Sequence, residues 1–446
     1  MSRWTYPEAG RGVALLQTSI EQVPQELFRD ELSQFLSWDQ PVDGALFVFG
    51  GRSGRLGDAT QYLKAVEYLD PTSLEWRRGP DMKFARVGLA AVYLENAYYV
   101  IGGYNQQSSE PQKSVERLDI KTMEWQSCAP LLVPRYGHSA CVCRNHIYVM
   151  GGDHSGMLVP FAERYDPLTN SWQRIPDMPL RVAASRAICI DEKVYLFGGC
   201  DPSVVGDRAS DAILMFDPDV NRWTVLAKRM RLGRTAFSLA PLVNGRKGVV
   251  IAGGFDLSSR PEIEVGSVEI IKDLPDDDDN RPLSPTMALP PLPLPRAGCQ
   301  GVCIPTKNFP VSLWEASEMP FIVLGGEYVD PLTGRCRVFD SATMLVNTDF
   351  AESVNVKKNG ISGFAGRALM ALKRRRQNGG IVAEPLQWSD YVIPPMLNKR
   401  TAFAACVGKV WPRGFGYSET EAGGDESTAD SSEEGSRSTF FGDWFS

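Results

Sequence analysis

The sequence predicts an all-β fold made from one repeated unit, because the same three features recur along it in one order. Gly-Gly doublets end six short apolar runs, and their first glycines are Gly50, Gly102, Gly151, Gly198, Gly253 and Gly325. The first four steps between the doublets are 52, 49, 47 and 55 residues, and the fifth is 72. An alternating run with a tryptophan and then an arginine follow most doublets. A period near fifty residues is typical of chains that use one supersecondary unit per repeat.

The first predicted element of each unit is a buried strand that ends at the doublet. Runs such as Ala45–Phe49 and Tyr98–Ile101 are rich in aromatic and β-branched residues and are too short for a helix. Paired glycines allow a turn with positive φ and close packing of the backbone. We therefore expect each doublet at a tight corner near the centre of the fold.

The second element is a strand with one buried face. Apolar and polar residues alternate and then stop at an Asp-Pro-type turn in four runs, Val66–Asp70, Val115–Asp119, Phe161–Asp166 and Ile213–Asp217. A tryptophan follows each run, namely Trp76, Trp125, Trp172 and Trp223. Tryptophan supplies a large apolar area, so we expect these side chains to fill the space between neighbouring units.

The third element is a strand of small residues that an arginine opens. The arginines are Arg86, Arg135, Arg181, Arg234, Arg296 and Arg400. Together, the arginine, Gly-Gly, Asp-Pro and tryptophan elements resemble the kelch repeat, in which four strands form one blade of a β-propeller. The resemblance covers roughly residues 44 to 410. It implies an all-β kelch propeller in which stacked blades close into a ring.

We predict six four-stranded blades, with strands from both ends of the chain closing the ring. Arg400–Val407 supplies the strand that the first doublet lacks. Trp4–Leu16 repeats the same order of residues, so a degenerate seventh blade that uses the N-terminus and Arg400–Gly416 is the alternative.

Blades five and six depart from the pattern. Blade five loses its tryptophan to an acidic, proline-rich insertion at about residues 272–295. Blade six keeps Arg337–Asp340 as its alternating run, carries a second insertion at about 341–387, and regains its tryptophan at Trp388.

Three segments follow from this division. Residues 1–43 are an N-terminal segment with a short helix over 23–36, residues 44–417 form the propeller, and 418–446 form an acidic tail. The tail is poor in apolar residues and is predicted to be disordered. Its eight acidic residues and one arginine account for the whole net charge of -7. The propeller is therefore nearly neutral and has no global field for nucleic acid.

The cysteines and the N-terminus bear on the compartment. Nine cysteines are scattered without Cys-x-x-Cys pairs, which favours a reducing cytoplasm over a disulfide framework. The N-terminus has no signal-peptide core, and no apolar run is long enough for a membrane span. We therefore expect no membrane association.

The sequence holds no constellation typical of catalysis. Its three histidines, His138, His146 and His154, have no further ligand at metal-binding spacing, and no nucleotide or nucleophile motif occurs. We expect a non-enzyme without metal or cofactor. Some kelch propellers are enzymes, among them an oxidase and sialic-acid epimerases, so a small-molecule enzyme that uses the channel is the alternative.

The resemblance implies a protein-interaction module, either a scaffold or a substrate-recognition subunit, for example in a ubiquitin ligase or a signalling pathway. Its contacts would lie after the doublets and beside the opening arginines, at one end of the channel. The candidate residues there are Arg52, Tyr104, Tyr136, His138, Asp153, His154, Asp201, Asp256 and Glu327. This set is mixed and mildly acidic, which favours a basic or aromatic peptide as partner.

Two further segments are candidates for docking. The basic cluster Lys373, Arg374, Arg375 and Arg376 is a candidate for nuclear import or for an acidic partner. The acidic tail ends in aromatic residues that could form a short docking motif, Phe440, Phe441, Trp444 and Phe445.

Overall fold

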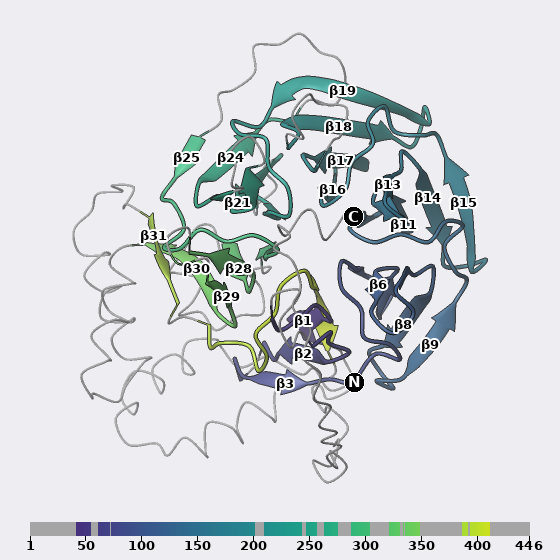
Figure 1. Ribbon diagram of the computed structural model, residues 1–446. Coiled ribbons are helices and arrows are strands. Elements are labelled where there is room, and N and C mark those ends of the chain that lie inside the picture. The colour runs from purple at the N-terminus through teal and green to yellow at the C-terminus, as the bar shows by residue number, and fades with distance from the viewer. Residues whose placement is uncertain are drawn as a thin grey trace, which may run out of the picture.

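The computed structural model describes residues 42–54, 61–71, 73–200, 209–242, 247–256, 263–274, 287–303, 321–330, 333, 335–347, 386–390 and 393–410. Regular structure in these ranges is β-strand, which confirms the all-β prediction. Figure 1 shows the strands as sheets that radiate from a central axis, with β3, β9, β15, β19, β25 and β31 on the circumference. None of the described segments is a helix long and apolar enough to cross a membrane.

The described strands form six antiparallel sheets of four strands, one per blade. From the channel outward, blade one contains β32 (Ala404–Val410), β1 (Val42–Phe49), β2 (Val66–Leu69) and β3 (Trp76–Arg78). Blade two contains β4 (Ala90–Leu94), β5 (Ala97–Ile101), β8 (Val115–Asp119) and β9 (Trp125–Cys128). Blade three contains β10 (Ser139–Cys143), β11 (His146–Met150), β14 (Ala162–Asp166) and β15 (Ser171–Ile175).

Blade four contains β16 (Arg186–Ile190), β17 (Lys193–Phe197), β18 (Ala212–Asp217) and β19 (Arg222–Arg229). Blade five contains β20 (Ser238–Pro241), β21 (Gly248–Ala252), β24 (Val268–Lys272) and β25 (Met287–Leu289). Blade six contains β26 (Gln300–Cys303), β27 (Phe321–Leu324), β30 (Ala342–Asn347) and β31 (Leu386–Ser389). Four blades add a two-stranded hairpin after the doublet: β6–β7 (Tyr104–Asn105, Glu110–Pro111), β12–β13 (Asp153–His154, Met157–Leu158), β22–β23 (Phe255–Asp256, Ile263–Glu264) and β28–β29 (Glu327–Val329, Cys336–Val338).

Strands from both ends of the chain close the ring. β1 pairs with β32 in antiparallel register, with Leu46 opposite Val407 and Phe49 opposite Ala404. The prediction of six blades closed in this way is confirmed. The seven-blade alternative is wrong, because β32 already completes blade one.

A closed circle of six backbone hydrogen bonds joins the blades around the channel. In each blade one residue donates its N–H to the carbonyl of the equivalent residue in the preceding blade, at 2.7–3.0 Å. The six residues are Gly88, Gly137, Ala184, Ala236, Gly298 and Ala402, and the circle ends where Gly88 donates to Ala402. All six have φ between 50° and 64°. Each of the three alanines in this left-handed region costs roughly 1–2 kcal/mol.

A buried arginine lies two residues before the circle in five of the six blades. In blade three, the Arg135 guanidinium donates to the Gly151 carbonyl at 2.9 Å and to the Phe161 carbonyl at 2.8 Å, and it pairs with Glu163. The second Glu163 oxygen accepts the Leu132 N–H at 2.8 Å. The same pair recurs as Arg86–Glu116, Arg234–Glu269 and Arg400–Glu67. This cluster holds the Gly-Gly corner to the third strand of its own blade.

The carbonyl of the same arginine binds the neighbouring blade. Gly103 donates its N–H to the Arg135 carbonyl at 2.9 Å, and a Cβ on Gly102 would lie 2.7 Å from that oxygen. Each doublet is therefore glycine both because φ is positive and because the next blade leaves no room for a side chain.

Blade four replaces the ion pair with an apolar pair, and this corrects one prediction. Arg181 is exposed and is not the equivalent of Arg135. Val182 occupies that place, because its carbonyl accepts the Gly152 N–H at 2.9 Å. Leu214 occupies the place of the glutamate, and both residues belong to one buried cluster. The sequence pattern predicts the position one residue too early, because Arg181 directly precedes Val182.

Blade six shows a third solution. Arg296 faces Thr343 at the place where blades one, two, three and five have glutamate. It donates instead to the Ser341 Oγ at 2.9 Å, and its guanidinium carbon lies 4.4 Å from the centroid of the Phe339 ring. The predicted alternating run at Arg337–Asp340 is wrong, because Arg337 belongs to hairpin β28–β29 and the third strand is β30. Trp388 does lie on the outer strand, as predicted.

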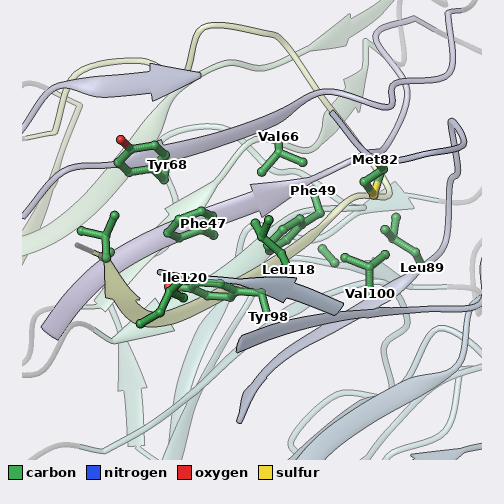
Figure 2. Close-up of a cluster of buried hydrophobic side chains, with 13 residues drawn as sticks. Phe47, Phe49, Val66, Tyr68, Met82, Leu89, Tyr98, Val100, Leu118 and Ile120 are labelled. Carbon is green, nitrogen blue, oxygen red and sulfur yellow. The ribbon is translucent and has the colours of Figure 1, made fainter. Parts of the chain in front are cut away.

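Apolar wedges between adjacent blades hold the core. Figure 2 shows the wedge between blades one and two, where Phe47 and Tyr98 lie beside Phe49 and Leu118. The ring centroids of Phe47 and Tyr98 are 4.1 Å apart. Tryptophans on the outer strands pack against these wedges. Each of them also donates its Nε1–H to a backbone carbonyl in a segment that leads into a blade. Trp125, for example, donates to Pro80 at 3.0 Å.

Blade four predicts how the ion pair in blade three responds to mutation. Removing one partner leaves the other as an unpaired buried charge, so Arg135→Val or Glu163→Leu alone should lower the free energy of unfolding by about 3–5 kcal/mol. The double variant recreates the Val182–Leu214 solution and should lose less than either single variant. Urea denaturation of the four proteins measures the cycle. Additive losses in the double variant would contradict this reading.

Candidate binding face at the mouth of the channel

One end of the channel, here called the mouth, is built from the residues that follow the doublets and those that precede the innermost strands. A single antiparallel bridge joins these two segments in each blade. The bridges are Arg52–Thr401, Val87–Tyr104, Tyr136–Asp153, Ala183–Cys200, Thr235–Phe255 and Ala297–Glu327. The predicted gathering of post-doublet residues at one end is therefore a direct result of the repeat.

Arg52 and Glu327 form an ion pair across the junction of blades one and six. The Arg52 Nη2 lies 3.0 Å from both carboxylate oxygens of Glu327, and both side chains are buried. Burial raises the pKa of Glu327, and nearby Glu264 raises it further, while Arg52 opposes both effects. A pair this enclosed stabilises the ring junction and leaves little charge for a ligand.

A tyrosine cluster, Tyr62, Tyr104 and Tyr136, spans blades one to three at the mouth. The rings of Tyr104 and Tyr136 meet edge to face at 5.5 Å, and both Tyr62 and Tyr104 affect the pKa of Tyr136. The Tyr136 hydroxyl hydrogen-bonds the buried Asp153 carboxylate, which also accepts the Gly156 N–H at 2.8 Å. Burial raises the pKa of all three groups that are shifted here, Tyr62, Tyr136 and Asp153. Tyr62 and Tyr104 remain partly exposed.

Exposed hairpin tips surround this cluster. Gln106–Glu110 at β6–β7 is exposed, and Met157 at β12–β13 is 65% exposed. On blade six, Arg335 and Arg337 are also exposed. The mouth thus has an aromatic cluster on blades one to three and polar and charged hairpin tips on the same face.

His138 lies in a different environment from the other candidates. It is 4% exposed and packs under the doublet of the preceding blade, where a Cβ on Gly102 would lie 2.7 Å from its Cε1. Burial, helped by the Arg135 charge, lowers the pKa of His138 to about 3. Its imidazole is therefore neutral near pH 7.

The remaining predicted residues are distributed as follows. His154 and Asp256 lie on the hairpins of blades three and five and are partly exposed. Asp201 lies outside the described residues, as do Lys373, Arg374, Arg375, Arg376, Phe440, Phe441, Trp444 and Phe445. Most of the segment 1–43 and the tail 418–446 also lie outside them.

Tyr62 was missed from the sequence. It bridges to Arg52 in the way that Pro111 pairs with Tyr104, so it occupies the return strand of a post-doublet hairpin. Aligning that return strand across the repeats, as well as the doublets, would have found it.

The channel itself contains a small cavity with about 120 Å³ of space for water-sized molecules. Ser139, Arg186 and Gln300 are among the side chains that line it. No group of three His, Cys, Asp or Glu residues in the described ranges is arranged to hold a metal ion.

Two family models match the chain. The KLHDC2/KLHL20/DRC7 Kelch-repeats domain matches residues 88–262, and the Kelch motif matches residues 41–83. The first match spans blades two to four and part of blade five, and the second spans most of blade one.

Individual relatives are similar over shorter stretches. Kelch-like protein 25 from Xenopus tropicalis is 31% identical over 183 residues, which is 41% of this chain and 23% of that protein. N-acetylneuraminate epimerase from Yersinia enterocolitica is 30% identical over 92 residues, 20% of this chain and 23% of that protein. The chain thus matches less than a quarter of the length of either relative. The solved structure of YjhT has a TM-score of 0.50 and 17% identity, covering 70% of this chain and 96% of that one.

The neutral state of His138 predicts a loss of stability in acid. The unfolded chain takes up a proton near the ordinary pKa of 6.5, whereas the folded protein takes it up only near 3, so stability should fall as pH drops through this window. The slope from this one group is about 1.4 kcal/mol per pH unit. The unfolding midpoint between pH 7 and pH 4 should therefore fall less steeply in His138→Asn than in wild type. The partly exposed His146→Gln serves as control, and equal slopes in all three proteins would refute the assignment.

Proposed function

This chain is a kelch-repeat β-propeller, and we propose that it works as a protein-interaction module whose partner contacts the mouth of the channel. The tyrosine cluster is the observation that supports this proposal most directly. Tyrosine gives a large, rigid contact area together with a hydroxyl, and it is enriched in the centre of protein interfaces. Here three tyrosines from three blades share one face, and two of them are partly exposed.

The scaffold under this face favours binding without rearrangement. Asp153 fixes the Tyr136 hydroxyl, and the circle of backbone hydrogen bonds fixes the blades that carry the cluster. A surface that is already ordered loses little conformational entropy when a partner binds.

The burial of the acidic groups at the mouth changes the kind of partner that we expect. Asp153 and Glu327 contributed to the expectation of a basic peptide, but both are buried and engaged within the protein. The accessible tyrosines of blades one and two are aromatic, so a partner segment with an aromatic or apolar residue is the better match. Glu110 and Arg337 on the rim would select the flanking charges.

The similarity to Kelch-like protein 25 supports a role as a protein-interaction scaffold, and we propose substrate recognition as one form of that role. Assembly into a ubiquitin ligase or a signalling complex is the finer form of this proposal.

Alanine substitutions at the rim of the tyrosine cluster test the proposal. Affinity purification with quantitative mass spectrometry from cells that express the protein should show partners that Tyr62→Ala and Tyr104→Ala each reduce about tenfold or more. Leu168→Ala is the matched control, because Leu168 is 88% exposed in the turn between β14 and β15, at the opposite end of the blade. The proposal fails if every partner survives both tyrosine variants, or if Leu168→Ala removes the same partners.

A small-molecule activity in the channel is the second candidate, because one relative is named N-acetylneuraminate epimerase. Proton transfer needs a side chain whose pKa lies near the working pH. Among the described residues that line the cavity, His138 has a pKa of about 3 and Arg186 has a pKa of about 10, and neither matches neutral pH. We therefore place this function below protein binding.

A further inference from the structure

We propose that the channel of the propeller is a binding site for a small oxyanion, such as phosphate or a short carboxylate, and that the Arg186 guanidinium is its anchor. This site is separate from the tyrosine cluster and does not depend on the protein-interaction role. It rests on the position of Arg186, on the lack of a countercharge, and on the polar groups around it.

Arg186 lies on the innermost strand of blade four and projects into the channel. Its Nη2 donates to the Cys299 carbonyl of the segment that opens blade six, at 3.2 Å, and its Nη1 donates to its own neighbour's carbonyl, Ser185, at 3.2 Å. The guanidinium thus extends past blade five and lies across the channel. The equivalent residues in the other blades are small or uncharged: Ala90, Ser139, Ser238, Gln300 and Ala404.

The charge of Arg186 has no carboxylate beside it among the described residues. It is the one charged side chain of the described cavity lining at neutral pH, and its two hydrogen bonds go to neutral carbonyls. Burial lowers the pKa of Arg186 to about 10, so it stays protonated near pH 7. Four of the buried arginines at the Gly-Gly corners, in contrast, each have a glutamate partner.

Arg186 is partly buried, and a cation with reduced access to water and no countercharge is costly, so an anion that supplies the charge stabilises it. The Arg186 Nε is buried and has no hydrogen-bond partner in the described structure. A guanidinium has five N–H donors in a planar fork, and that fork matches the oxygens of a phosphate or carboxylate. Two of the five are used here, so three remain for an oxyanion.

The surrounding groups suit an oxyanion. Ser139 and Ser185 share a hydrogen bond at 2.8 Å between their hydroxyls, and Gln300 also lines the cavity. Hydroxyls can rotate to donate to an anion. The cavity of about 120 Å³ has room for several water molecules or for one small ion.

Thermal unfolding of the full chain in inorganic phosphate tests the site. Because a ligand that binds only the folded state raises its stability, about 50 mM phosphate should raise the Tm of the wild type by a few degrees. Arg186→Gln should lose most of this rise, and Arg186→Lys, which keeps the charge but not the fork, should retain part of it. Arg222→Gln, at an exposed arginine on β19, should behave as wild type and reports the general effect of phosphate on the protein.

The comparison within each variant, with and without phosphate, separates binding from any change in basal stability. Crystals soaked in selenate provide a second readout, with anomalous density expected beside the Arg186 guanidinium. An equal phosphate-dependent rise in Arg186→Gln and wild type would overturn the proposal, because the effect would then be non-specific. A wild-type Tm that does not respond, together with an empty channel after the soak, would overturn it as well.

Discussion

The circle of six backbone hydrogen bonds around the channel is the constraint on which the rest of the molecule depends. Each blade contributes one N–H and one carbonyl to it, so the circle closes only with all six blades present. The contributing residues must adopt positive φ, and three of them do so as alanine despite the steric cost.

The mouth and the channel are consequences of this circle. The residues directly beside it form the bridges to the post-doublet segments, which bring Tyr62, Tyr104 and Tyr136 onto one face. The residues directly inside it line the cavity, which places Arg186 across the channel. One closure element therefore positions two surfaces of different chemistry, an aromatic mouth that suits a protein and a cationic lumen that suits a small anion.

Most of the ring could be predicted from the sequence, because its demands are local and repeated. Glycines with positive φ, tryptophans that seal the wedges and arginines that hold the corners all occur at similar spacing, so the blade number and the closure by Arg400–Val407 followed directly. The wrong predictions fall in the blades where a different residue type occupies the position of the arginine or of its glutamate partner. In blade four, Val182 with Leu214 replaces the ion pair, so the search for an opening arginine gave Arg181 instead of Val182. In blade six, Thr343 on β30 replaces the glutamate, and the search for an alternating run that ends at an aspartate gave Arg337–Asp340 instead of β30.

The functional residues were harder to predict because their significance depends on burial and on neighbours from other blades. Asp153 and Glu327 are acidic in the sequence, but the fold buries them and engages their carboxylates within the protein. Arg186 lies in a strand that the sequence pattern describes only as a strand of small residues, so the pattern does not single it out. Nothing local to Arg186 shows that its guanidinium reaches Cys299, which is 113 residues away along the chain.

Hydrogen exchange at residue resolution tests the closed circle most directly. The amides of Gly88, Gly137, Ala184, Ala236, Gly298 and Ala402 should exchange as slowly as those of the buried strand β5, because opening any one bond opens the ring. Exchange of one or more of these six amides as fast as in the exposed tip Gln107–Ser109 would contradict the account, since the ring would then be open at that junction.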